Sequence, residues 1–487
     1  MNILKNIVRV GLIVTALSFN LVSCDYLDVV PPEQAGLQDA TKTRKSTLGF
    51  LFTCYAGLQE DDSPIGHTSA LNGSTDEFAL PIEWRNDSGA FWDDYAYNLV
   101  SAANPDGLWG NYYKYIGQCY LFLRQVENNP GETLLQEWLP GEKEQWLAEA
   151  HFLIAYYHFA LLRKYGPIPV VTEYVPQSTP SSEFGGRCHY DYCVNWIAYQ
   201  LDLAAQNLPP TREGTEWGRA TSTMAKALKA RVLMYAASPL WNGQFPFSSW
   251  KNKVNTPGDK DFFVGDDAKY KESIGRDDYG IELVSSSYNE KKWERAMEAC
   301  QKALDFALNE GGCRLYGTEA SDMTLYQTEL GNSDKWLPYV PGKEDNNIQE
   351  NREFKERVMM LRYMVASRYP HNKELIWGLT GKNIRIQGRI PAHIFQTGNK
   401  TSWAGGFSAI SPTLYTIEHF YTEDGVLPEE AASTGDFASR AEWFQKAGIA
   451  GNNREDIIKL CVNREPRFYA WMAFDGGDYG SKLLKAS

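Results

Sequence analysis

The strongest constraint on the fold is a long run of apolar residues at helical spacing between residues 143 and 165. Apolar side chains recur there every three or four positions and cover a wide face of the predicted helix, which Gly166-Pro167 ends. This face comprises Trp146, Leu147, Ala150, Leu153, Ala155, Tyr157, Leu161 and Leu162. A helix with so broad an apolar face has to be buried against other helices, so this segment predicts a mainly helical protein.

The same spacing recurs in five further segments. We expect helices over residues 46–58, 109–126, 192–207 and 222–237, and another that begins near residue 291. Thr221 or Ser222 can cap the first turn of the fourth of these helices. Helix pairs of this kind resemble tetratricopeptide units, which bury their faces by stacking on their neighbours. The period is not the regular 34 residues of that repeat, because insertions interrupt it. The longest insertion runs from 240 to 292, inside what would be one helical hairpin.

From residue 311 onward the helical signal weakens. Short extended segments are expected at 375–379 and 384–386, and a helix at 414–421. The predicted fold class is therefore mainly α, with tetratricopeptide-like helix pairs and long irregular loop insertions.

The amino terminus has the pattern of a secretion signal. Lys5 and Arg9 precede an apolar run over residues 10–21, which is shorter than the about 20 residues that span a bilayer. Leu21-Val22-Ser23-Cys24 follows and resembles the lipobox of bacterial lipoproteins. We predict a signal peptide over 1–23 and lipid attachment at Cys24, with more than one acyl chain for stable anchoring. The alternative is an ordinary cleaved signal beside a free cysteine.

The charge balance excludes one class of partner. The chain has 48 Lys and Arg against 61 Asp and Glu, for a formal net charge of −13. Binding to nucleic acid needs clustered basic residues, and no such cluster exists in this sequence. We therefore expect no nucleic-acid partner and contact with the membrane only through the lipid anchor.

The candidate metal and catalytic patterns are weak, so we expect no cofactor, no metal and no catalytic residue. Cys188-His189-Cys193 lacks the paired, tighter spacing of a zinc site. His151 and His158 can share a helix face, but no carboxylate completes a motif such as H-E-x-x-H. Most cysteines are expected to be free and buried. Because pairs of acidic residues occur in predicted loops, a glycoside hydrolase with two opposed carboxylates stays a less favoured alternative. Acidic loops can also bind calcium, so a calcium site stays an alternative as well.

Four runs of residues, spread over the chain, are distinctive. They are Cys24-Asp25-Tyr26-Leu27-Asp28 with Pro31-Pro32-Glu33, Glu149-Ala150-His151-Phe152 continuing to Lys164-Tyr165-Gly166-Pro167, Gly218-Arg219-Ala220-Thr221 leading into Ala227 to Pro239, and Asn463-Arg464-Glu465-Pro466-Arg467-Phe468-Tyr469. Together they resemble the SusD/RagB family of outer-membrane nutrient-binding lipoproteins from Bacteroidetes. The resemblance implies a SusD-like fold, no enzymatic activity, and a surface lipoprotein that passes oligosaccharide to a SusC-like TonB-dependent outer-membrane transporter.

The family resemblance also divides the chain and leaves alternatives open. It gives a signal peptide over 1–23, a helical-repeat region with loop insertions over 24–310, and a loop-rich ligand-binding region over 311–487. The last region is expected to be incomplete, because family members continue past residues 463–469 into a further helix. Some members capture peptides, so a peptide ligand stays an alternative, as does a pure protein-interaction scaffold.

The aromatic residues supply the candidate ligand site. A flat aromatic face packs against the apolar face of a sugar ring, and 15 Trp, 28 Tyr and 22 Phe are present, many outside the helical patterns. The candidates in predicted loops are Trp84, Trp92, Tyr95, Trp336, Tyr339 and Trp403. For any one of them, packing or loop anchoring is an equal alternative. Residues assigned to the core are Trp109, Trp146, Trp196 and Trp293.

Overall fold

The computed structural model describes residues 36–58, 75–79, 101, 107–176, 178–180, 183–247, 250–323, 327, 336–366, 371–379, 411–451 and 456–478. Cys24, the lipid-attachment residue predicted above, lies outside these ranges.

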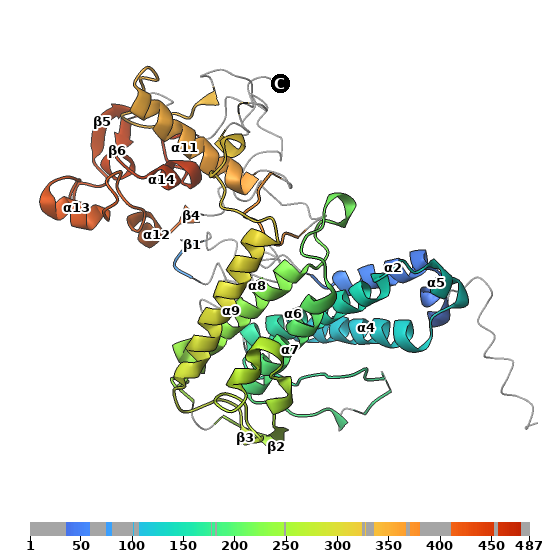
Figure 1. Ribbon diagram of the computed structural model, residues 1–487. Coiled ribbons are helices and arrows are strands. Elements are labelled where there is room, and N and C mark those ends of the chain that lie inside the picture. The colour runs from blue at the N-terminus through green and yellow to red at the C-terminus, as the bar shows by residue number, and fades with distance from the viewer. Residues whose placement is uncertain are drawn as a thin grey trace, which may run out of the picture.

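A stack of helices makes up the larger part of the described structure (Figure 1). Its members are α2 (Arg44–Tyr55), α4 (Leu108–Asn128), α6 (Glu142–Tyr165), α7 (Tyr190–Asn207), α8 (Ser222–Ala237) and α9 (Glu290–Asn309). Each helix packs against the next in chain order, and the short α5 (Glu132–Glu137) and the 3-10 helix η1 (Leu37–Thr41) lie beside α2. The prediction of a mainly α fold with tetratricopeptide-like helix pairs is confirmed.

The helix boundaries follow from local sequence signals. α8 has the predicted bounds, and the Thr221 hydroxyl accepts a hydrogen bond from the Met224 amide at 3.2 Å, as an N-cap should. α6 ends where Gly166 adopts a φ of +67°, a conformation that glycine reaches without steric cost. The other predicted helices of the stack lie within two or three residues of the observed bounds.

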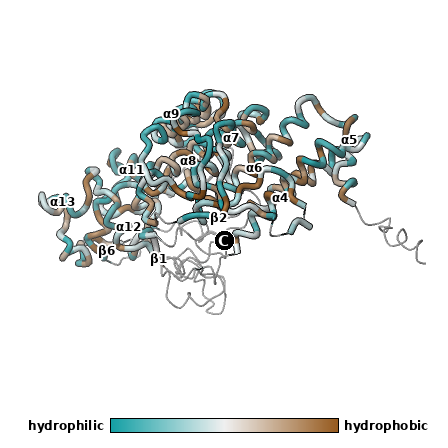
Figure 2. Tube along the Cα trace, turned by 90° about the horizontal axis from the view of Figure 1, so that it is seen from below, coloured by the Kyte–Doolittle hydropathy of each residue, from teal (hydrophilic) through white to brown (hydrophobic). Residues whose placement is uncertain are grey.

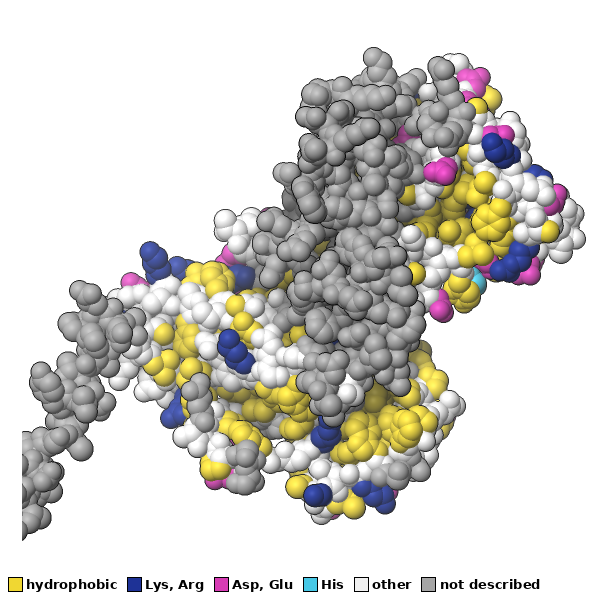
Figure 3. All heavy atoms as spheres, turned by 180° about the vertical axis from the view of Figure 1, so that it is seen from behind, with side chains coloured by type: hydrophobic (Ala, Val, Ile, Leu, Met, Phe, Trp, Pro, Cys, Tyr) yellow, Lys and Arg dark blue, Asp and Glu magenta, His cyan; other side chains and the backbone are white. Residues whose placement is uncertain are grey.

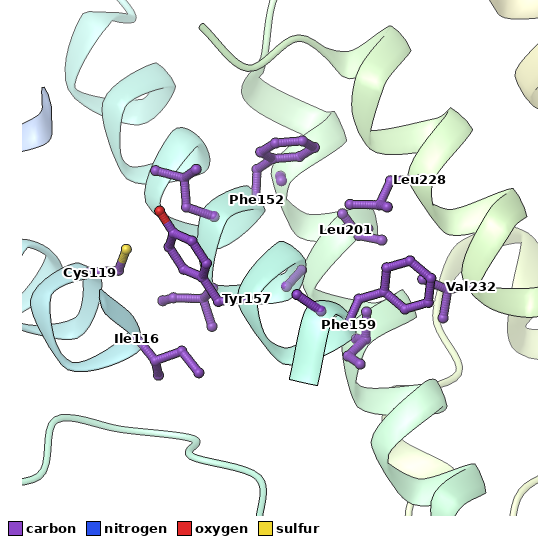
Figure 4. Close-up of a cluster of buried hydrophobic side chains, with 14 of the residues drawn as sticks. Ile116, Cys119, Phe152, Tyr157, Phe159, Leu201, Leu228 and Val232 are labelled. Atoms are coloured by element: carbon purple, nitrogen blue, oxygen red, sulfur yellow. The ribbon is translucent and has the colours of Figure 1, made fainter. Parts of the chain in front are cut away.

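One continuous apolar core runs through the helical stack. Figure 4 shows side chains from four successive helices meeting there, and hydrophobic and hydrophilic segments alternate along the helices in Figure 2. The labelled side chains are Ile116, Cys119, Phe152, Tyr157, Phe159, Leu201, Leu228 and Val232. Trp146 and Trp196 belong to this core and are buried, whereas Trp109 is half-buried at its edge.

The predicted insertion between α8 and α9 forms a small unit of its own. It contains the 3-10 helices η6 (Pro239–Trp241), η7 (Lys260–Phe262) and η8 (Gly265–Tyr270), and strands β2 (Lys251–Pro257) and β3 (Asp278–Glu282), which pair antiparallel. α8 and α9 still pack against each other across this insertion. Asp259 fastens the insertion to the stack, because its carboxylate accepts hydrogen bonds from Asn195 of α7 at 2.5 Å and from Tyr279 at 2.8 Å.

The assignment of Trp293 to the core is wrong, because its side chain is 40% exposed on α9. The buried face of this helix carries charged residues instead. Lys292 lies 2.6 Å from Asp191, and Arg295 lies 2.5 Å from Asp267. These ion pairs set the rotation of α9 about its axis and turn the large apolar residues of the helix outward. The exposed residues are Trp293, Met297, Leu304 and Leu308.

The carboxyl-terminal part of the chain has a second, smaller core. It is built from α11 (Gln349–Ala366), α12 (Leu414–Glu418), α13 (Pro428–Thr434), α14 (Pro466–Trp471), η12 (Lys459–Cys461) and the antiparallel pair β5 (Lys446–Ala450) and β6 (Asp456–Ile458). Strand β4 (Ser411–Pro412) pairs antiparallel with β1 (Phe78–Ala79), which joins this region to the amino-terminal part of the chain.

Arg464, from the last of the distinctive sequence runs, organises the second core. Its side chain is fully buried, and its guanidinium donates to the carbonyl oxygens of Leu460, Ile417 and Phe420 at 2.6 to 2.8 Å. Burial lowers the pKa of Arg464 to about 10. The motif is therefore structural, since it ties the start of α14 to the segment around α12.

Two local predictions for this region need correction. The helix expected over 414–421 ends at Glu418, because the His419 amide bonds to the Thr416 carbonyl and the chain then turns. The extended segment expected over 375–379 is irregular and pairs with no described strand. Trp377 instead packs against the core of the helical stack, whereas Leu375, Ile376 and Leu379 are exposed. Residues 384–386 lie outside the described ranges.

None of the described helices has the length and apolar character needed to cross a membrane.

Candidate functional site

The predicted ligand-binding aromatics fall into two groups. Trp84, Trp92, Tyr95 and Trp403 lie outside the described residues, and their role stays a prediction. Trp336 and Tyr339 are described, and both are half-buried in the carboxyl-terminal region.

Tyr339 is held firmly beside the second core. Its hydroxyl donates to the Ala450 carbonyl at 2.5 Å, and its backbone amide donates to Asp478 at 3.1 Å. Burial and the nearby Glu344 carboxylate raise the pKa of Tyr339 to about 12. These contacts suit a residue that anchors its loop, and a contribution to ligand binding stays a prediction.

A different set of aromatic side chains forms a pocket among the described residues. The pocket has a volume of about 340 Å³ and lies between the end of α2 and the segment 371–379. Its lining consists of Phe52, Tyr55, Ala56, Leu58, Gly218, Trp377, Gly378 and Leu379; we call it the aromatic pocket. Such a volume is in the range of small-ligand sites, which is about 300–1,000 Å³.

Phe52 and Trp377 supply the flat apolar surfaces of the aromatic pocket. Phe52 is 47% exposed, so its ring is available to a ligand. The Trp377 indole N–H donates to the Gly218 carbonyl at 3.0 Å, and its ring meets the edges of Phe152 and Tyr156, each with centroids 5.2 Å apart. Trp377 is therefore fixed in place while one part of it lines the pocket.

Tyr55, which lines the aromatic pocket, also belongs to a buried ionic network. Glu149 of α6 is fully buried, and its carboxylate accepts from Arg212 at 2.9 Å, from Arg219 at 2.6 Å and from the Tyr55 hydroxyl at 2.5 Å. Burial and the Glu149 carboxylate raise the pKa of Tyr55 well above its usual value. Glu216 pairs with both guanidinium groups on the outer side. The network thus fixes α2, α6 and the loop before α8 to one another.

This network explains two of the distinctive sequence runs. Glu149 opens the run that continues through α6, and Arg219 stands in Gly218-Arg219-Ala220-Thr221. The two residues are 70 positions apart in the chain, yet they form a buried salt bridge that is linked to the pocket through the Tyr55 hydroxyl.

The aromatic pocket has the chemistry of a binding site. Arg219 lies 5.9 Å from the Phe52 ring centroid, and its charge is already matched by Glu149 and Glu216. The carboxylate of Glu149 is fully engaged and excluded from solvent, so it is not placed to act as a general acid or base. The pocket offers aromatic surface with hydrogen-bonding groups at its edge, which suits an uncharged ring-shaped ligand.

The histidines and cysteines singled out in the sequence have structural roles. The His158 ring nitrogens bond to the Ile154 carbonyl at 2.8 Å and the Val171 amide at 3.2 Å, and burial lowers the His158 pKa to about 4. Cys188 and Cys193 are free thiols. Within the described ranges, no three His, Cys, Asp or Glu residues lie together as a metal site would need.

The aromatic pocket was missed in the sequence, although two signals for it are present. Phe52 lies off the apolar stripe of its helix, which runs through Leu48, Leu51 and Tyr55, so the sequence places its ring on the outer face of the helix. Trp377 stands in a segment read as a strand, which hid its place against the helices.

The pocket also lies close, along the chain, to the predicted loops. Leu58 begins the connection that carries Trp84, Trp92 and Tyr95, and Leu379 precedes the stretch that carries Trp403. Figure 3 shows hydrophobic side chains at the surface of both the helical stack and the carboxyl-terminal region.

Comparison with solved structures reveals clear relatives. The structure named BT4246 superposes with a TM-score of 0.76 at 48% sequence identity, and the match covers 90% of this chain and 66% of that chain. A SusD-like protein (BF3747) from Bacteroides fragilis superposes with a TM-score of 0.55 at 18% identity, covering 90% of this chain and 62% of that one, and shows the fold alone. The chain thus spans about two thirds of the length of these relatives.

Comparison with sequence families agrees with the structural matches. No curated protein matches the chain. A family model described as starch-binding and associating with the outer membrane matches residues 25–234, and the SusD family model matches residues 373–485. These matches include the second and fourth of the distinctive sequence runs completely, the first without Cys24 and the third up to residue 234. The chain belongs to the SusD/RagB family, whose members bind glycans at the outer membrane.

Proposed function

We propose that this protein captures oligosaccharides at the cell surface, without chemically altering them, and passes them to a SusC-like TonB-dependent transporter in the outer membrane. The observation that carries the binding step is the aromatic pocket, in which exposed Phe52 and fixed Trp377 line one cavity together with Tyr55. Aromatic faces pack against the apolar faces of pyranose rings. Because Tyr55 is already held by Glu149 and Trp377 by Gly218, these two side chains need little ordering when a ligand binds.

The aromatic residues predicted from the sequence complete the site in this proposal. Two or three of Trp84, Trp92, Tyr95, Trp336, Tyr339 and Trp403 extend the platform that Phe52 and Trp377 begin. A ligand longer than one sugar ring would then contact several aromatic faces in succession.

The binding step is tested by calorimetry against a panel of neutral oligosaccharides, with fragments of starch as the first probe, and against a peptide panel. Phe52→Ala should weaken glycan binding with an unchanged melting temperature, because Phe52 is exposed. Trp377→Ala should weaken binding and also lower the melting temperature, since the indole packs on the core. Phe444→Ala, a change at a 65% exposed ring outside the pocket, is the matched control.

The outcomes separate the possible ligands. Glycan binding that survives both Phe52→Ala and Trp377→Ala would contradict the placement of the site. Binding of peptides with no glycan bound would favour the peptide-capturing alternative. Appearance of shortened glycan during incubation would contradict the proposal that the protein is not an enzyme.

The delivery step follows from the family, whose members associate with the outer membrane. Extraction in mild detergent should recover the lipoprotein with a large outer-membrane partner. Recovery at good yield with no such partner would count against delivery to a transporter.

A further inference from the structure

A second pocket adjoins the aromatic pocket. It has a volume of about 330 Å³ and lies between the start of α8, the turn after α9 and the segment 371–379. Thr211, Glu213, Trp217, Gly218, Glu310, Gly312 and Lys373 are among its lining residues; we call it the polar pocket. Gly218 lines both pockets, so they share a wall.

The contact between the two pockets is close and well defined. A Cβ on Gly378, which lines the aromatic pocket, would come within 2.8 Å of the ring of Trp217, which lines the polar pocket. Leu375 lines the polar pocket, and Trp377, two residues later, lines the aromatic one. The segment 371–379 therefore runs past both cavities and brings them side by side along one edge of the helical stack.

The charged groups of the polar pocket indicate what it can bind. The Arg212 guanidinium is paired with Glu149 and Glu216 and is nearly buried. Glu213 and Glu310 are exposed, and neither carboxylate has a hydrogen-bond or ion-pair partner among the described residues. Carboxylate oxygens accept strong hydrogen bonds from hydroxyl groups, whereas they repel an anionic ligand. Because Lys373 lines the pocket as well, acidic and basic side chains are both present, and this mixture suits a neutral molecule with many hydroxyls.

We propose that the polar pocket is a second subsite for the same glycan, so that the protein selects neutral oligosaccharides long enough to fill both pockets. The inference rests on the proposed function. In this arrangement one end of the ligand stacks on Phe52 and Trp377. The other end donates hydroxyl hydrogen bonds to Glu213 and Glu310, with the Trp217 ring as the wall beneath it.

The test compares a short and a long ligand, maltose and maltoheptaose, because the matching family model is described as starch-binding. The variant is Glu213→Ala/Glu310→Ala, which removes both acceptors from exposed positions. Affinity for maltoheptaose should fall about tenfold, since hydrogen bonds to charged groups are among the stronger ones. Affinity for maltose, which fills only the aromatic pocket, should be unchanged. Glu282→Ala on β3, at an exposed carboxylate outside both pockets, is the matched control.

The outcomes distinguish this inference from the proposed function. Equal loss for both sugars, or no loss for either, would overturn the second subsite and leave the aromatic pocket in place. Loss of maltoheptaose binding with Glu282→Ala as well would show a general charge effect and would also overturn it. If neither sugar binds the unaltered protein, the second subsite is overturned, while the proposed function still rests on the wider glycan panel. If Phe52→Ala and Trp377→Ala both leave the two affinities intact, the placement of the aromatic pocket as the glycan site is contradicted and the second subsite falls with it.

Discussion

At the scale of single residues, Glu149 has the largest structural consequence. Its buried carboxylate is the common partner of Arg212, Arg219 and Tyr55, and it has no access to water that could replace them. Glu149→Gln should lower the free energy of unfolding by about 3–5 kcal/mol, because two guanidinium groups then lose their buried counter-charge. Denaturant unfolding measures this change. Glu144→Gln, at an exposed position of the same helix, is the control, and similar small losses for both variants would contradict the structural role of Glu149.

Two buried histidines should make the protein sensitive to acid. Burial lowers the pKa of His158 and of His189 to about 4 in each case. In the unfolded chain a histidine has a pKa of about 6.5. Between about pH 6.5 and about pH 4 the unfolded state therefore binds more protons than the folded state does. The free energy of unfolding should therefore fall as the pH falls from about 6.5 to about 4, by on the order of 3 kcal/mol for each histidine.

Urea unfolding at a series of pH values checks the histidine prediction. His158→Gln should flatten the dependence on pH in this interval, although it also lowers stability at neutral pH through lost packing. His371 is exposed and provides the control, because its replacement by Gln should leave the pH dependence as it was. A pH profile that His158→Gln does not alter would contradict the prediction.

At the scale of elements, α9 shows how ion pairs can override an apolar pattern. Lys292 and Arg295 face α7 and the insertion, and Trp293 faces outward. Trp146→Ala in α6 should cost about 3–5 kcal/mol of stability, since it empties a space in the core. Trp293→Ala should change stability by only about 0.5 kcal/mol. Melting temperatures of the two variants measure the contrast, and an equal loss in both would mean that Trp293 is covered.

At the scale of the whole molecule, the candidate site lies where distant parts of the chain meet. The indole of Trp377 bonds to Gly218 and packs on Phe152, so the segment 371–379 is fastened to the helical stack. Strands β1 and β4 make a second junction between the amino-terminal and carboxyl-terminal parts. Segment 371–379 lines both pockets. Their shape therefore depends on how this segment packs on the helical stack and not on any one helix pair.

The lipid anchor is also a property of the whole molecule. If Cys24 carries acyl chains, Cys24→Ser should release the protein from membranes or leave its signal peptide uncut, because buried acyl methylenes supply the membrane affinity of a lipid anchor. Metabolic labelling with a fatty acid and fractionation of membranes measure the effect. Cys54→Ser, at a buried free thiol, is the control. Absence of acyl label from the unaltered protein would contradict this prediction.

Local sequence signals were enough to predict the helices and the family resemblance, whereas the candidate site depends on which distant residues meet in the folded chain. Periodicity, caps and glycine stops are local signals, so α6 and α8 were predicted almost to the residue. Which side chains from distant segments meet is a matter of packing. Glu149 contacts Arg219, Phe52 lines the same cavity as Trp377, and Trp293 faces outward on α9. These arrangements depend on the whole folded chain, because a buried charge needs a partner from a distant segment and the core has to be filled without voids.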